Sequence, residues 1–149
     1  MRDGHHAPTL IIDGSARPVI VQIDGLAPTF EGRIQQMFVA GQALACDGDA
    51  GRLRNVYFVS EAWLSQAQGG KLPEVPPSQD PQRKEVLIVD GVEAKSHRAR
   101  VAIYEMVRDE QGNLREIREI ILPDDSTTSS DSPLLEAFLT GFWANSRTR

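Results

Sequence analysis

The sequence predicts an α+β domain with a single, mainly antiparallel sheet of about five to six strands, one long helix packed on it and a short C-terminal helix. Short β-rich segments alternate with turn-forming residues, whereas residues 27–48 and the last apolar segment have a helical period. With 149 residues, 40% of them hydrophobic and 25% charged, the chain has the size and composition of one globular domain spanning residues 1–149.

Two β-rich segments open the predicted sheet. Residues 9–12 and 18–23 flank the turn-forming sequence DGSAR and are typical of a hairpin, with Pro18 at the start of the second strand, where a missing N–H does least harm. A helix is predicted next: Thr29 or the proline before it can begin the helix and Gly48 can end it. Its apolar face would contain Ile34, Met37, Phe38, Gly41, Leu44 and Ala45.

Four strands and a helix complete the domain. The strands are predicted at residues 52–65, 84–91, 98–107 and 114–122, the last three as antiparallel neighbours. Segment 114–122 also fits a helix, but the QGN turn before it and its β-branched residues favour a hairpin. A Pro- and Gly-rich loop (65–83), a polar linker (123–131) and a final helix (132–143) remain.

Residues 56–63, VYFVSEAW, are apolar on both faces over most of their length. This pattern is typical of a central strand that is covered on both sides. Because the long helix can cover only one face of the sheet, we expect the terminal helix to cover the other face or to contact another subunit.

The composition excludes several classes of protein. A net charge of −5 argues against a nucleic-acid partner, because binding a phosphate backbone needs clustered cations. No apolar segment is long enough to cross a bilayer, and the only cysteine, Cys46, cannot form an internal disulfide. We therefore expect a cytoplasmic protein, and the motifs of cofactor and zinc sites are missing from the sequence.

A short motif surrounds the long loop. The strand ends in E-A-W at residues 61–63, and the next strand is preceded by P-x-R-x-E, with Pro81, Arg83 and Glu85. This arrangement resembles a set of uncharacterised bacterial proteins of unknown function, and the resemblance extends over about half of the chain. The resemblance implies that the loop and its flanking strands form a recurring structural unit, and it carries no activity.

Glu61 is an ionisable residue among apolar neighbours. A buried carboxyl with a raised pKa would suit a general acid or base. The alternative is a salt bridge from Glu61 to Arg83 that fastens the two ends of the loop. We favour the salt bridge, because a buried charge without a partner is costly.

A second candidate site is the sequence VDGVEAK. Glu93 and Lys95, with Asp80 or Asp90 as a second acid, resemble the E-x-K arrangement of metal-dependent nucleases, in which carboxylates hold Mg²⁺ and a lysine orients water. The tripeptide is short and occurs often by chance. The same residues equally fit a turn with solvated charges.

A third candidate site is the basic segment that follows. Lys95, His97, Arg98 and Arg100 could together receive an anion such as phosphate. The alternative is that they form the polar start of the next strand.

These observations favour a non-enzymatic binding or regulatory module with no catalytic or metal-ligating residues. Its contact surface would be the long loop with Trp63 near its root, and Phe142 and Trp143 would provide aromatic contacts in a homodimer formed through the terminal helix. The alternatives are the metal-dependent hydrolase and a small-ligand sensor with a pocket between helix and sheet.

Overall fold

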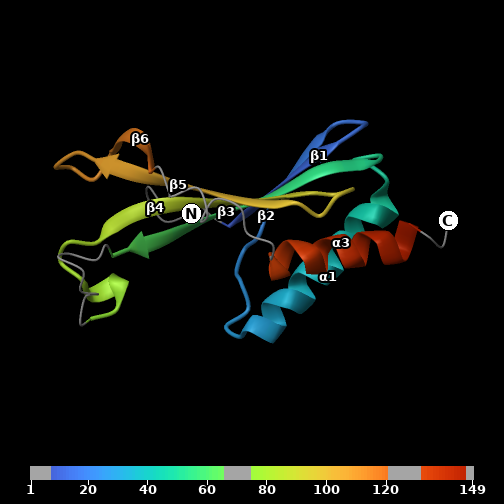
Figure 1. The fold of residues 1–149 in the computed structure, drawn as a ribbon, viewed down its shortest axis with the longest axis horizontal. Helices are drawn as coiled ribbons and strands as arrows, with labels where there is room; N and C mark the ends of the chain where they lie inside the picture. Colours follow the sequence, from blue (N-terminus) through green and yellow to red (C-terminus); the bar gives the residue numbers. More distant parts are fainter. Residues whose placement is uncertain (1–7, 66–74, 121–131, 147–149) are drawn as a thin grey trace.

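A six-stranded antiparallel sheet is the framework of the protein in the computed structural model, which describes residues 8–65, 75–120 and 132–146 (Figure 1). The strands are β1 (Thr9–Gly14), β2 (Pro18–Gln22), β3 (Leu53–Leu64), β4 (Lys84–Glu93), β5 (Ala99–Arg108) and β6 (Leu114–Ile120). The helices are α1 (Phe30–Asp47), the short 3-10 helix η1 (Pro77–Gln79) and α3 (Pro133–Ser146). The predicted α+β class is confirmed.

The order of the strands is β2-β1-β3-β4-β5-β6, and all neighbouring strands are antiparallel. The predicted hairpins are present, including β5–β6, so the ambiguous segment after the QGN turn is a strand. Residues 66–74 of the predicted 65–83 loop and the whole 123–131 linker lie outside the described residues, and η1 lies within the described part of the loop.

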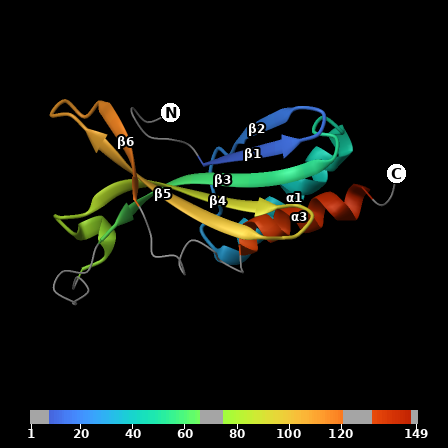
Figure 2. The ribbon, with the colours of Figure 1, turned by 45° about the horizontal axis from the view of Figure 1, so that its top comes forward.

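The two long helices lie side by side on one face of the sheet, beneath the half that contains the β1–β2 and β4–β5 turns (Figure 1, Figure 2). The other half of the sheet, with the β5–β6 hairpin, extends beyond them. Of the two alternatives predicted for the terminal helix, cover of the opposite face is therefore wrong. Within the described ranges, no helix is long and apolar enough to cross a membrane.

Helix α1 begins and ends where its sequence predicts. The Thr29 hydroxyl accepts a hydrogen bond from the Gly32 N–H at 3.1 Å, which satisfies one of the free donors of the first turn. Gly48 ends the helix with a left-handed φ of 70°, a conformation that costs glycine little.

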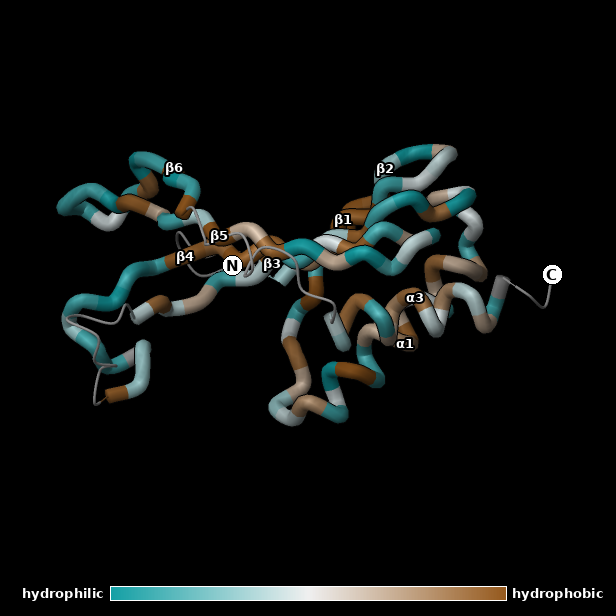
Figure 3. The backbone as a smooth tube through the Cα atoms, viewed as in Figure 1, coloured by the Kyte–Doolittle hydropathy of each residue, from teal (hydrophilic) through white to brown (hydrophobic). Residues whose placement is uncertain are grey.

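The core lies between the helices and the half of the sheet above them. Figure 3 shows that the middle of the sheet is hydrophobic, whereas β6 is mostly hydrophilic. The fully buried side chains of this core include Leu10 and Ile12 of β1, Met37 of α1, Val56 of β3, Val92 of β4, and Leu135, Phe138 and Leu139 of α3. The sensor hypothesis would place its pocket at the helix–sheet interface, and that interface is thus filled with side chains.

Two glycines bring α1 and α3 into backbone contact. A Cβ atom at Gly41 would lie 2.0 Å from the carbonyl oxygen of Phe138, and a Cβ at Gly141 would lie 2.0 Å from that of Phe38. Each helix therefore has its glycine under the backbone of the other. This close crossing explains why the terminal helix packs beside α1.

The described helices cover only one face of β3, so helices in this part of the chain provide the predicted two-sided cover on one side alone. Val56 and Phe58 face the helices. Tyr57 and Glu61, which alternate with them, lie on the opposite face and are only half-buried. No helix in the described ranges covers this second face, on which Val59 is nevertheless buried.

Candidate anion-binding site

A cavity of about 710 Å³ opens where the start of β3 meets the β4–β5 turn and the C-terminal half of α3. Its wall combines basic and apolar side chains: Ser15, Arg52, Leu53, Arg54, Ala94, Lys95, His97 and Trp143 line it. Four of these eight residues are basic or can become cationic, on a chain whose net charge is −5. Positive charge is thus concentrated around one concave surface.

Backbone hydrogen bonds hold the two arginines at this place. The N–H of Arg52 donates to the Ser15 hydroxyl at 2.8 Å, and the Ser15 N–H donates to the Arg52 carbonyl at 2.8 Å. The N–H of Ala94 donates to the Arg54 carbonyl, also at 2.8 Å. Leu53, between the arginines, is buried, so it anchors the segment that presents their exposed side chains.

His97 fixes the β4–β5 turn against α3. Its φ is 61°, a left-handed conformation that histidine adopts more readily than most residues, and its N–H donates to the Glu93 carbonyl at 2.8 Å. Its Nδ1 lies 2.7 Å from Oε2 of Glu136 on α3. The turn that carries Lys95 is therefore tied to a helix of the core.

The cavity's arginine and lysine side chains have no ionic partners among the described residues. Arg52, Arg54 and Lys95 make no salt bridge with any residue in the described ranges. Elsewhere on the same chain, Arg17 pairs with Asp49 at 3.1 Å and Lys84 with Glu105 at 3.2 Å. The positive charge at the cavity is thus available to a ligand.

The apolar part of the wall is formed by Trp143, Leu53 and Ala94. Trp143 packs edge-to-face against Phe142, with ring centroids 5.2 Å apart and an interplanar angle of 84°. A wall of this kind suits the apolar or aromatic part of a ligand, and the cations suit a carboxylate, sulfonate or phosphate group.

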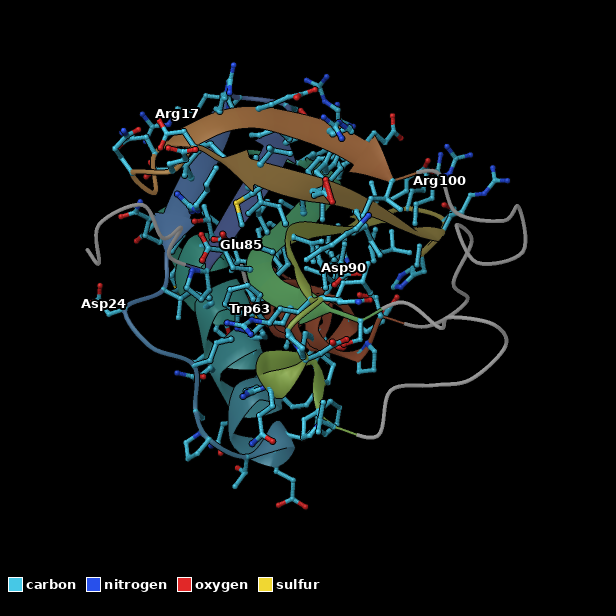
Figure 4. All side chains as sticks on the ribbon, turned by 90° about the vertical axis from the view of Figure 1, so that its left-hand side faces the viewer. Arg17, Asp24, Trp63, Glu85, Asp90 and Arg100 are labelled. Carbon is cyan, nitrogen blue, oxygen red and sulfur yellow. The ribbon has the colours of Figure 1, made fainter. Side chains whose placement is uncertain are left out.

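The structure divides the basic segment that was predicted as one anion site. Lys95 and His97 line the cavity, whereas Arg98 and Arg100 line two other concavities, of about 330 and 540 Å³, with Tyr57 as a shared neighbour. Figure 4 shows Arg100 at the side of the molecule opposite Arg17. The turn separates the two pairs because His97 reverses the chain between them.

Sequence reasoning missed Arg52 and Arg54. Both flank a buried leucine at the start of β3, and this alternation of cation and apolar residue was their only sign in the sequence. Their proximity to Lys95 follows from the β3–β4 pairing, in which Asn55 lies opposite Glu93. Such long-range pairing is not visible in a local pattern.

The predicted salt bridge between Glu61 and Arg83 is wrong. The Arg83 guanidinium lies 4.4 Å from the centre of the Trp63 ring and donates a hydrogen bond to the Asp80 carbonyl at 3.2 Å. Within the described ranges, Arg83 makes no salt bridge. The motif residues do meet, because Trp63 lies opposite Glu85 in the sheet (Figure 4).

Glu85 instead pairs with Arg108 of β5. The Nε and Nη2 atoms of Arg108 donate to the two carboxylate oxygens at 2.7 and 2.8 Å, and both side chains are less than a fifth exposed. These hydrogen bonds raise the pKa of the Arg108 guanidinium; burial opposes this effect, while the charges of Glu85 and Glu61 add to it. At this end of the sheet, Glu85 and Arg108 thus form a salt bridge between β4 and β5.

The residues of the nuclease hypothesis do not converge. Asp90 shares a face of β4 with Val92, toward the helices, whereas Glu93 points to the opposite face and Asp80 precedes the other end of the strand. Burial raises the pKa of the Asp90 carboxyl above its ordinary value. Among the residues with described positions, no three His, Cys, Asp or Glu side chains are grouped to hold a metal.

The predicted aromatic contacts are in different surroundings. Phe142 is 5% exposed and belongs to the core, so its prediction as a dimer contact is wrong. Trp143 is half-buried and lines the cavity. Trp63, at 41% exposed, is the accessible one of the three.

Comparisons with known proteins give no relative: no family model, no curated protein and no solved structure matches this chain. Its function must therefore be inferred from its own geometry.

Proposed function

We propose that this chain is a non-enzymatic binding module, which accepts an anionic ligand with an apolar body in the cavity beside the β4–β5 turn. One observation carries this proposal: Arg52, Arg54 and Lys95 surround a cavity with a tryptophan wall and make no salt bridge with the described residues. An anion bound there would provide the ionic partner that the described residues do not.

The energetics favour a ligand with two parts. Hydrogen bonds from arginine or lysine to a carboxylate or phosphate contribute about 1.5–3 kcal/mol each, because one or both groups are charged. Burial of the ligand's apolar part against Trp143, Leu53 and Ala94 adds roughly 25 cal/mol per Å² of area removed from water. A small inorganic anion would use only the first contribution and would bind more weakly.

The site is held in shape before a ligand arrives. Ser15 and Arg52 exchange hydrogen bonds, Ala94 binds the Arg54 carbonyl, and His97 contacts Glu136 of the core helix. A preformed site does not have to order these segments on binding, which favours affinity. Ser15 and His97 thus contribute to the shape of the site through these contacts.

A second candidate surface is the root of the long loop. Trp63 is 41% exposed and has the Arg83 guanidinium on its ring. Tryptophan and arginine are the residues that contribute most often to the energy of protein–protein contacts. This pair favours a protein partner for the loop region.

Fluorescence titration with anilinonaphthalene sulfonate, an aromatic anion, would test the cavity. We expect the double variant Arg54→Gln/Lys95→Gln to bind the probe at least about tenfold more weakly than the parent chain, since loss of one charged hydrogen bond is enough for that change. The matched control is Arg115→Gln on β6, an exposed arginine without a salt bridge in the described part of the chain.

The neutral probe anilinonaphthalene gives a second comparison. It lacks the sulfonate, so we expect weaker binding and no response to the double substitution. Equal affinity of the parent and the double variant for the sulfonate would contradict the proposal, as would an equal loss in the Arg115→Gln control.

A further inference from the structure

The two edges of the sheet differ in charge. The edge strand β6 has the sequence LREIREI, in which four of seven residues are charged. The opposite edge strand β2, PVIVQ, has none, and four of its five residues are exposed. Charged side chains on an edge strand discourage pairing with another chain, whereas a neutral apolar edge is a template for it.

Within the described part of the chain, the backbone of β2 has unpaired N–H and C=O groups at two positions. Ile23 donates its N–H to the Pro8 carbonyl at 2.8 Å, and bonded and non-bonded pairs alternate along an antiparallel ladder. Val19 and Val21 are therefore bonded to β1. The N–H and C=O groups of Ile20 and Gln22 point away from the sheet, toward a further strand.

Pro18 is placed where this edge tolerates it. It shares the outward positions with Ile20 and Gln22, so its missing N–H removes no bond to β1. The outward-pointing N–H and C=O groups that can pair with a further strand are thus those of Ile20 and Gln22, on either side of Val21.

The neutral surface continues from β2 onto α1. From Pro18 to Cys46 the sequence has only three charged residues, Asp24, Glu31 and Arg33, which is far below the proportion in the whole chain. A groove of about 510 Å³ runs between the two elements, lined by Gln22, Ile23, Gly32, Gln35, Gln36 and Val39. Ile20 is 68% exposed and Val39 is 53% exposed. Depletion of charge beside exposed apolar side chains is typical of a protein interface.

We propose that a second copy of this chain binds here, with the two β2 strands antiparallel across a two-fold axis, so that both sheets join into one. In the register centred on Val21, Ile20 lies opposite Gln22 of the partner subunit and Gln22 opposite Ile20 of the partner subunit. Each bonded pair exchanges two hydrogen bonds, so all the free groups of these two residues are satisfied.

A second copy fits this surface for three reasons. In both copies the residues of β2 whose backbone groups point outward are the even-numbered ones, so the two strands can pair in a symmetric register. Two chains that each have a net charge of −5 repel one another least where both are neutral. The two-fold axis stands perpendicular to the sheet, so both α1 helices lie on the same side and the exposed Val39 residues face a common groove.

Sedimentation velocity over a wide range of concentration tests this interface. We expect the parent chain to form dimers, and Ile20→Lys to raise the dimer dissociation constant at least about tenfold, because it places like charges next to each other. The matched control is Ile117→Lys, which changes a similarly exposed isoleucine on the other edge and should leave dimerisation intact. Thermal unfolding by circular dichroism would verify that both variants are folded.

Amide hydrogen exchange gives a readout specific to this register. In the dimer, we expect the N–H groups of Ile20 and Gln22 to become protected as the concentration rises, whereas those of Val19 and Val21 are protected at every concentration. A monomer at high concentration would overturn the proposal and would leave a foreign extended peptide as the alternative occupant. A dimer in which Ile20 and Gln22 remain unprotected would also overturn it, because the contact would then lie elsewhere.

Discussion

Substitution of either glycine at the helix crossing should destabilise the protein, although alanine is the better helix former. Gly41 lies inside α1 and Gly141 inside α3, where a change from glycine to alanine ordinarily stabilises by about 0.5–1 kcal/mol. At this crossing, however, each new methyl group would lie 2.0 Å from a carbonyl oxygen of the other helix. We therefore expect Gly41→Ala and Gly141→Ala to destabilise.

The magnitude follows from that distance. Carbon and carbonyl oxygen atoms in close contact are roughly 3.3 Å apart, so the helices must separate by about 1.3 Å to admit the methyl group. This displacement also pulls Phe138 and Leu139, both buried, from their places in the core. Overpacking of a core costs about 1–3 kcal/mol, and the backbone contact places these variants in the upper part of that range. After the helix-propensity gain is subtracted, we expect a net loss of about 1–2 kcal/mol for each variant.

The two effects should not add. Once one alanine has separated the helices, the second methyl group no longer collides with the other helix. The double variant should therefore lose clearly less free energy of unfolding than the sum of the two single losses. Urea unfolding would measure the free energies, with Gly25→Ala as the control, because a Cβ there meets nothing within 4 Å. If both single variants were more stable than the parent chain, or if their effects were additive, the backbone contact between α1 and α3 would be refuted.

Three further predictions concern single side chains. Asp90→Asn should stabilise the protein at neutral pH. The pKa of Asp90 is raised in the folded state, so the parent chain loses stability as the pH rises through that pKa, whereas the variant does not. In unfolding measurements below pH 3.8, the ordinary pKa of the carboxyl, the advantage of the variant should disappear. Glu85→Gln should lower the free energy of unfolding by about 1–3 kcal/mol, because it removes the carboxylate charge that both hydrogen bonds from the mostly buried Arg108 reach; an unchanged urea midpoint would contradict this. Arg83→Ala should cost about 0.5–1 kcal/mol and shift the NMR signals of the Trp63 ring, and unchanged ring signals would exclude the stacking.

Local patterns predicted the elements of this fold well. The Thr29 cap and the left-handed Gly48 bound α1 as expected, and the turn after β5 correctly decided that the next segment is a strand. Each of these decisions depends on residues within a few positions of each other. The hydrogen bonds that satisfy them are equally local.

Placement of the elements in space was harder to predict. The sequence contains no local sign that Gly41 would meet the backbone of α3, so the position of the terminal helix was missed. Similarly, the sequence did not show that Arg83 would lie on the Trp63 ring. Both outcomes depend on contacts between segments that are distant in the sequence.

The contrast between the two ends of the sheet is what favours a ligand at one of them. At the loop end, two arginines have partners within the protein: Arg108 binds Glu85, and Arg83 lies on Trp63. At the end beside the β4–β5 turn, Arg52 and Arg54 are exposed and have no salt bridge in the described part of the chain. Exposed cations without partners contribute little to the stability of a fold, so stability alone does not account for their grouping around a tryptophan-lined cavity. Binding of an anion does account for this grouping. The same cations that contribute almost nothing to folding stability form strong contacts once a ligand excludes water from them.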